Sequence, residues 1–232
     1  MNFKEDLKQL NIDLTDVASK RLQMYYEFLV EYNERVNLTA ITDYDGVYYK
    51  HFYDSLTLSL ALDLSKPINL VDVGAGAGFP SIPNAICFEN LNVTIIDALN
   101  KRITFLNELI SRLELTNAKA LHARAEEYAN LHKEQADVVT ARAVARLNVL
   151  AELCLPLVKV GGLFVAMKSV ESELELSEAK NAIKVLGASY VKTINVELPN
   201  ELGKREILVF KKVSHTPNKY PRQFSQIKNK PL

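Results

Sequence analysis

From residue 68 onward, short apolar runs alternate with stretches of helical periodicity, and this alternation constrains the fold more than any other feature. The apolar runs are INLVDV (68–73), NVTIID (92–97), AKALHA (118–123), DVVTAR (137–142) and GLFVAMK (162–168), and the helical stretches lie near 79–88, 99–115, 143–158 and 170–186. Strands that alternate with helices of this length form right-handed βαβ units in a parallel sheet covered on both faces. Two further strands, near 189–197 and 206–212, are joined only by a short turn, so we expect them to pair antiparallel in a seven-stranded sheet.

The part of the chain before this pattern is predicted to be helical. Residues 13–37 carry apolar side chains at helical spacing after two candidate caps, Asp13 and Thr15, and residues 45–62 show a second stripe of this kind. The patterns divide the chain into an N-terminal helical cap (1–62), a Rossmann-like α/β domain (63–213) and a basic C-terminal tail (214–232).

The composition excludes several classes of protein. With 48% hydrophobic residues, the 232-residue chain is too apolar for intrinsic disorder. No apolar run approaches the roughly 18 residues of a membrane span, and the opening residues lack the apolar core of a secretory signal. The cysteines, Cys87 and Cys154, lie in apolar surroundings and are not spaced like metal ligands. We therefore expect a reduced, cytoplasmic monomer with no metal and no membrane partner.

The segment VDVGAGAGFP (71–80) lies where the first strand passes into the first helix. Its glycines allow a tight turn and a close approach of the backbone to a ligand. A dinucleotide-binding loop, G-x-G-x-x-G, would need a third glycine where Phe79 or Ser81 stands, so an NAD enzyme is excluded. The observed G-x-G-x-G resembles the S-adenosylmethionine loop of class I (Rossmann-like) methyltransferases.

The loop therefore supplies the first candidates for cofactor binding. Gly74, Gly76 and Gly78 would admit the ligand, and the carboxylate of Asp72 in the preceding strand suits the ammonium and sulfonium groups of S-adenosylmethionine. A tight turn without a ligand is the alternative explanation of these glycines.

Acids also stand at the ends of the next two strands. Asp97 ends the second strand and could accept hydrogen bonds from both ribose hydroxyls, although it could equally cap the following helix. Ala125 and Glu126 follow the third strand and could hold the adenine amino group, but Glu126 could also be an ordinary acid at a helix start. Because the carboxyl ends of consecutive strands bind ligands in open α/β sheets, the three features together favour a cofactor site.

The loop after the fourth strand carries cations in place of a nucleophile or a base. It has no Asn/Asp-Pro-Pro-aromatic box and no cysteine, but it has Arg142 and Arg146, and Lys168 ends the fifth strand. Such a site suits an acceptor that is already nucleophilic, such as guanine N7, because no proton must leave before attack. We expect Arg142 and Lys168 to position the acceptor without a general base.

Several motifs together resemble one family. They are NLTAI (37–41), HFYDSL (51–56), VDVGAGAGFP (71–80), the Ala125-Glu126 pair, TARAVARL (140–147) and the closing YPR…KNKPL (220–232). In this order they are similar to the bacterial small-subunit ribosomal RNA guanine-N7 methyltransferases, the RsmG or glucose-inhibited division protein B family. The resemblance covers nearly the whole chain. It implies methyl transfer from S-adenosylmethionine to guanine N7 in 16S ribosomal RNA, free or in the small ribosomal subunit.

Carried over position by position, the resemblance assigns Gly74, Phe79, Ala125, Glu126 and Arg142 to the cofactor. This role of Arg142 competes with a contact to the target base, and both interpretations remain open.

The end of the chain is strongly basic. From Gly203 onward eight Lys or Arg side chains stand against one acid, so this stretch carries +7 and the preceding 202 residues −7. We expect an extended RNA-binding segment, because its prolines disfavour a regular helix, with Tyr220 and Phe224 available to stack on bases. The RNA-binding candidates are Arg146, Lys219, Tyr220, Arg222 and Lys228. A solvated tail without a role is the alternative.

Two side chains of the helical cap, His51 and Ser55, stand one helical turn apart and could close the methionine end of the pocket. A packing role for His51 is the alternative. Two other functions also remain: a small-molecule methyltransferase of the same fold, or a non-catalytic RNA-binding module.

Overall fold

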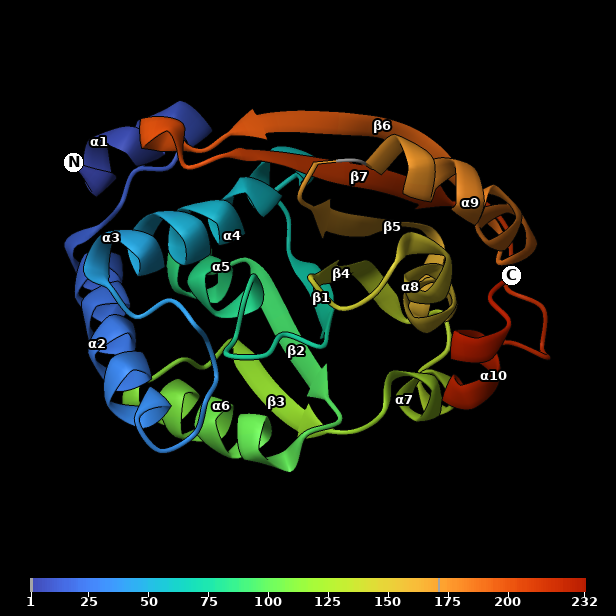
Figure 1. The fold of residues 1–232 in the computed structure, drawn as a ribbon, viewed down its shortest axis with the longest axis horizontal. Helices are drawn as coiled ribbons and strands as arrows, with labels where there is room; N and C mark the ends of the chain where they lie inside the picture. The colour runs from blue at the N-terminus through green and yellow to red at the C-terminus, as the bar shows by residue number, and fades with distance from the viewer. Residues whose placement is uncertain (1, 171) are drawn as a thin grey trace.

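A seven-stranded sheet runs through the centre of the computed structural model, which describes residues 2–170 and 172–232 (Figure 1). Its strands are β1 Ile68–Val73, β2 Leu91–Asp97, β3 Ala118–His122, β4 Ala136–Arg142, β5 Val158–Lys168, β6 Ala188–Glu197 and β7 Lys204–Lys212, in the spatial order β3-β2-β1-β4-β5-β7-β6. The first five strands pair parallel, and β7 lies antiparallel between β5 and β6. The predicted mostly parallel sheet and the antiparallel pairing of the last two strands are confirmed.

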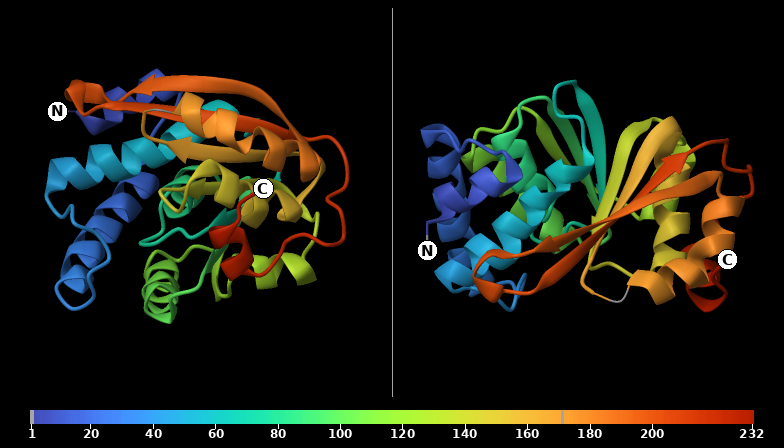
Figure 2. Two further views of the ribbon diagram at one scale, coloured as in Figure 1. Left: turned by 45° about the vertical axis from the view of Figure 1, so that its right-hand side comes forward. Right: turned by 90° about the horizontal axis from the view of Figure 1, so that it is seen from above.

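Successive side chains of a strand point to opposite faces of the sheet, and each face has its own apolar cluster. In β1, for example, Leu70 belongs to one cluster and Val71 to the other. The N-terminal helices, α5 and α6 cover the first face, while α7, α8, α9 and α10 cover the second (Figure 2). Burial on both faces explains why the parallel strands are continuous apolar runs.

The first long helix, α2, spans Asp16–Asn33. Thr15 is its N-cap, because its hydroxyl accepts a hydrogen bond from the backbone N–H of Ala18 at 3.1 Å. The helix ends at Asn33 and not at the predicted residue 37, because the Asn33 side chain forms hydrogen bonds with the following loop. Its side-chain oxygen accepts from the backbone N–H groups of Leu38 and Thr39, at 2.8 and 3.0 Å, and its amide nitrogen donates to the carbonyl of Thr39. This turn brings Leu38 and Thr39 to the carboxyl edge of the sheet.

The second helical stretch of the cap is continuous over residues 44–61, although its geometry changes along its length. Its parts are α3 Tyr44–Gly46, the π-helical η2 Val47–Tyr53, α4 Asp54–Leu56 and the 3₁₀ segment η3 Thr57–Ala61. Tyr48, Phe52 and Leu56 of the predicted stripe are buried. Two short elements that the sequence did not predict, α1 Phe3–Asp6 and η1 Leu7–Leu10, precede α2.

The helices between the strands lie close to their predicted positions. They are α5 Ser81–Cys87, α6 Asn100–Arg112, α8 Leu147–Cys154 followed by η4 Leu155–Leu157, and α9 Ser172–Val185, while η5 Pro199–Glu201 forms the turn between β6 and β7. The pattern missed α7 Ala125–Leu131, which is only 7 residues long. None of the helices described over 2–170 and 172–232 combines the length and apolarity needed to cross a membrane.

The expectation that the C-terminal segment is extended throughout is wrong. Phe224–Asn229 form a helix, α10, which packs against the second face of the sheet through the buried side chain of Ile227. Pro221 and Pro231 lie outside this helix, so their missing N–H groups do not interrupt it.

The attachment of α2 to the sheet can be tested with one substitution. Leu22 is fully buried, and the neighbouring ring of Phe28 stacks on Phe105 of α6 with 5.2 Å between centroids. We expect Leu22→Ala to lower the free energy of unfolding by about 2–5 kcal/mol, because it leaves a cavity. Met24→Ala, at an exposed position of the same helix, is the control, and urea denaturation measures both. Equal effects of the two substitutions would contradict this packing.

Candidate active site

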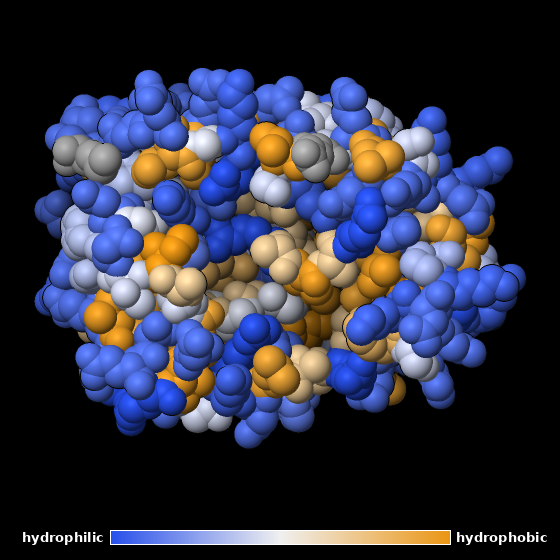
Figure 3. Space-filling model, viewed as in Figure 1, coloured by the Kyte–Doolittle hydropathy of each residue, from blue (hydrophilic) through white to orange (hydrophobic). Residues whose placement is uncertain are grey.

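A cavity of about 550 Å³ opens at the carboxyl edge of the sheet, and Figure 3 shows it as a hollow on this face of the molecule. It is lined where four strands end: by Val73 of β1, Asp97 of β2, Ala123 after β3 and Arg142 of β4. The chain runs from β1 outward through β2 and β3, and then returns to β4 on the other side of β1. Such a reversal of strand order leaves a crevice in which open α/β sheets bind ligands.

The glycine loop forms one wall of this cavity. Gly74 and Gly76 line it, and both have positive φ, 77° and 61°. A Cβ atom on Gly76 would meet no protein atom within 4 Å, so this position faces open space. Gly78 differs, because its Cβ would strike Ile82 and the hydroxyl of Tyr25, each at 2.8 Å. Gly78 is not among the residues that line the cavity, and its lack of a side chain allows the loop to pack against the helices, so its contact with the cofactor stays a prediction.

Asp72 also lies outside the cavity lining. It is fully buried beneath the loop, where its Oδ2 accepts a hydrogen bond from the hydroxyl of Ser81. Burial raises the pKa of Asp72 to about 7, and the Ser81 hydrogen bond and the charge of Arg142 oppose this shift. In this structure Asp72 supports the loop from beneath, and its contact with the cofactor stays a prediction.

Asp97 lies in the cavity wall and organises two neighbouring segments. Its Oδ1 accepts from the backbone N–H of Leu99 at 2.9 Å, which orders the turn into α6. Its Oδ2 accepts from the guanidinium of Arg102 at 3.2 Å and from the N–H of Gly76 at 3.4 Å. The two interpretations of Asp97, a ligand contact and a helix-start contact, are therefore compatible. Its Oδ1 binds the turn before α6, and its Oδ2 faces the glycine loop.

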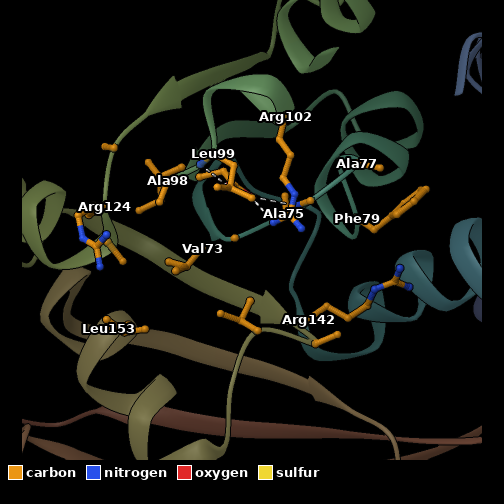
Figure 4. Close-up of a pocket in the computed structure, with 18 of the residues that line it drawn as sticks. Val73, Ala75, Ala77, Phe79, Ala98, Leu99, Arg102, Arg124, Arg142 and Leu153 are labelled. Carbon is orange, nitrogen blue, oxygen red and sulfur yellow. Dashed lines mark hydrogen bonds and ion pairs between the residues drawn. The ribbon is translucent and has the colours of Figure 1, made fainter. Parts of the chain in front are cut away.

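The end of the cavity beyond Asp97 is formed by α7, α8 and α10. Glu126 is paired with Arg124 at 2.7 Å, and Ala125, Leu153 and Phe224 complete the wall. Figure 4 shows Arg124 and Leu153 at the end of the cavity opposite Phe79 and Arg142.

Arg142 dominates the other end and is held by the N-terminal helices. Its guanidinium donates to Oδ2 of Asp54 at 2.8 Å and to the carbonyl of Lys50 at 3.4 Å, and it lies 5.1 Å from the ring centre of Phe79. The Nε of Arg205 on β7 contacts the same Asp54 oxygen at 3.3 Å. Asp54 thus connects α4 to two strands of the sheet.

His51 lies between Arg142 and the loop after α2. Its Nδ1 lies 3.2 Å from both the guanidinium of Arg142, which can only donate, and the carbonyl of Lys50, which can only accept, and its Nε2 lies 2.9 Å from the hydroxyl of Thr39. Burial, aided by the charge of Arg142, lowers the pKa of His51 to about 4, so the ring is neutral at physiological pH. The ring also stacks on Phe79, with 4.4 Å between centroids.

The packing and pocket interpretations of His51 are compatible, because its ring lines the cavity and packs on Phe79. Ser55, however, is fully buried and donates to the carbonyl of His51, so it does not face the cavity.

Comparison with known proteins assigns the chain to a family. The family described as rRNA small subunit methyltransferase G matches residues 18–206. The chain belongs to this family. It is 55% identical over 220 residues to the ribosomal RNA small subunit methyltransferase G of Staphylococcus aureus strain Newman. The aligned residues make up 94% of this chain and 92% of that protein. The corresponding protein of strain JH9 is 54% identical over the same shares.

Solved structures of other proteins share this fold. TrmN from Thermus thermophilus has a TM-score of 0.54 at 18% identity, over 72% of this chain and 53% of that chain. M. jannaschii TYW2 in complex with AdoMet has a TM-score of 0.53 at 18% identity, over 64% of this chain and 70% of that one. At such identities the likeness shows the fold, and the predicted class I methyltransferase fold is confirmed.

The five positions that the family resemblance assigned to the cofactor all line the cavity: Gly74, Phe79, Ala125, Glu126 and Arg142. Lys168 does not. Its ammonium group donates to the carbonyl of Ala145 and pairs with Glu175, both at 2.7 Å, so it holds the loop after β4 instead of facing the acceptor. Arg146 is also outside the cavity, at the surface, where it pairs with Glu178 at 2.9 Å.

The RNA-binding candidates of the tail divide into two groups. Tyr220 is buried, and Arg222 donates to both oxygens of the fully buried Glu152, with 2.6 Å between Nη2 and Oε2. Both side chains thus contribute to the packing of the tail, and their contact with RNA stays a prediction. Lys219 and Lys228 are exposed and remain candidates.

Several residues at the site were not predicted. Asp54, Arg102 and Arg124 hold charged groups of the cavity wall, and Thr39 and Leu153 line it. Asp54 lies within the HFYDSL motif, so an acid in a buried helical stripe could have signalled a partner of opposite charge. Among residues 2–170 and 172–232, no cluster of His, Cys, Asp or Glu could hold a metal ion.

The protonation of His51 provides a test of this geometry. Because the unfolded chain has the ordinary pKa of 6.5 and the folded chain a pKa of about 4, His51 makes folding less favourable as the pH falls from 6.5 to 4. An NMR titration should give the low pKa in the wild type and a higher pKa, still below 6.5, in Arg142→Gln, since burial remains. An ordinary pKa in the wild type would contradict this arrangement.

Proposed function

We propose that this protein transfers a methyl group from S-adenosylmethionine to N7 of a guanine in 16S ribosomal RNA. The observation that carries the proposal is a single cavity that joins the open glycine cradle at Gly76 to the cationic end at Arg142. The family and its curated relatives, which are named as methyltransferases of small-subunit ribosomal RNA, support it.

The donor end fits S-adenosylmethionine, which supplies an electrophilic methyl group when bound. Gly76 leaves space beside the backbone for the methionine portion, and Gly74 lets the loop pass close to Val144 at the same wall. Asp97 presents a carboxylate in the middle of the cavity for the ribose hydroxyls, and the segment Ala125–Glu126 lies beyond it for the adenine. The order of these residues along the cavity is the order of the three parts of the ligand.

The acceptor end supports an acceptor that need not lose a proton. Of the described residues lining the cavity, only Asp97 and Glu126 are acids, and they are paired with Arg102 and Arg124. Both ring nitrogens of His51 already lie within hydrogen-bond distance of Arg142, Lys50 or Thr39. No side chain in this lining is therefore free to act as a general base, as guanine N7 allows. Arg142, immobilised by Asp54, is the residue we propose to orient the base or the donor.

The RNA partner would contact the protein around this opening. Arg146, Lys219 and Lys228 are the exposed cations that we propose for phosphate contacts. We further propose that the protein acts in the cytoplasm as a monomer, with the helical cap (1–62), the α/β domain (63–213) and the tail (214–232) as its functional parts.

Donor binding can be tested at the glycine loop. Gly76→Val should abolish binding of S-adenosylhomocysteine in calorimetry, because the branched side chain would enter the open cradle. Gly161→Val is a matched control: Gly161 also has positive φ, 89°, and a Cβ there would also meet nothing within 4 Å. The two substitutions therefore strain the backbone similarly, and loss of binding in both, or in neither, would contradict the assignment.

The methyl acceptor can be tested by nucleoside analysis and by the pH dependence of the rate. Small-subunit RNA from a strain lacking the protein should gain 7-methylguanosine on incubation, and kcat should vary little between about pH 6 and 9. Because burial raises the pKa of Asp72 to about 7, the profile should also be measured in Asp72→Asn. A steep rise that persists in this variant, with another methylated nucleoside, would overturn N7 as the acceptor.

A further inference from the structure

The C-terminal segment contributes a wall of the cavity, although its basic composition predicted a separate RNA-binding role. Phe224, the first residue of α10, lines the cavity together with Leu153 of α8 and Arg124. Its ring lies 5.0 Å from the guanidinium carbon of Arg124, which is itself paired with Glu126. An aromatic ring therefore lies beside the ion pair of Arg124 and Glu126, at the end of the cavity formed by α7.

Phe224 is held in this place by a buried anchor two residues earlier. Glu152 of α8 is fully buried and accepts from the backbone N–H of Arg222 at 2.9 Å as well as from its guanidinium. Ile227, one turn further along α10, is fully buried in the second apolar cluster. Lys133 donates to the carbonyls of Pro217 and Tyr220. These contacts fix the segment on both sides of Phe224.

The place of Phe224 along the cavity identifies the part of a ligand that it would meet. Arg142 and Phe79 lie at one end and Arg124 with Leu153 at the other, with Ala98, the residue after Asp97, between them (Figure 4). Under the proposed function, on which this inference rests, the end with Arg124 and Leu153 receives the adenine. Adenine offers a flat aromatic face, and aromatic side chains stack on such faces regardless of hydrogen bonding.

We infer that Phe224 packs against the adenine ring of the methyl donor, so that the C-terminal segment is part of the cofactor pocket. The anchor between Arg222 and Glu152 positions this ring and does not itself touch the ligand. One consequence concerns the basic tail: neutralising Arg222 would disturb donor binding as well as the surface charge, whereas neutralising Lys219 or Lys228 would change only the charge.

Affinity measurements test the inference directly. By calorimetry, Phe224→Ala should weaken S-adenosylhomocysteine binding by about tenfold, within the range expected for the loss of one stacking partner. Phe224→Tyr should retain the affinity, and Gln226→Ala, at an exposed position of the same short helix, is the control. Free adenosine, as a competitor, should lose affinity by a similar factor in Phe224→Ala.

A spectroscopic test uses the absence of tryptophan from the natural sequence. Phe224→Trp would carry the only indole of the protein, and its fluorescence should be quenched when S-adenosylhomocysteine or adenosine is added. Gln226→Trp should show no comparable change. If the wild type binds and Phe224→Ala binds equally well, or if the fluorescence of Phe224→Trp does not respond, the inference is overturned while the proposed function stands. If the wild type itself does not bind S-adenosylhomocysteine, the proposed function fails first.

Discussion

The buried carboxylate of Asp54 is the interaction on which the site depends most. It joins a helix of the N-terminal part to Arg142 at the end of β4 and to Arg205 on β7. With 4% of its surface exposed, the aspartate is almost without water, and removing one partner of such a pair leaves an uncompensated charge. Because Arg142 in turn contacts the ring of His51, one ion pair joins the helical cap to the sheet and sets the Arg142 end of the cavity.

Two further buried acids organise the rest of the molecule by the same principle. Asp97 connects the glycine loop to the start of α6, and Glu152 ties the C-terminal segment to α8. Each of these acids accepts more than one hydrogen bond, which compensates the cost of burying its charge. The cavity is thus bordered by segments from both ends of the chain, which explains why its lining includes Thr39 and Phe224.

Much of this architecture could be predicted from the sequence because its determinants are local. Strand periodicity, the glycine loop and the acids at strand ends are read over a few residues, and parallel strands necessarily bring their carboxyl ends to one edge. The short helices α7 and α10 were not predicted, because helices of 7 and 6 residues contain too few repeats of an apolar stripe. The prolines of the tail were read correctly as helix breakers, but they border α10 instead of interrupting it.

The sequence by itself determined the fold class, the family and the position of the donor loop, since residue order and periodicity specify them. Only the tertiary structure decided which charged side chains are free. In the sequence, Lys168 and Arg222 cannot be distinguished from exposed cations. In the structure each is paired with an acid, Lys168 with Glu175 and Arg222 with Glu152, which is 70 residues away along the chain. The free energy of a charge depends on its partners and its exposure to water, and the folded chain brings those partners together from distant positions.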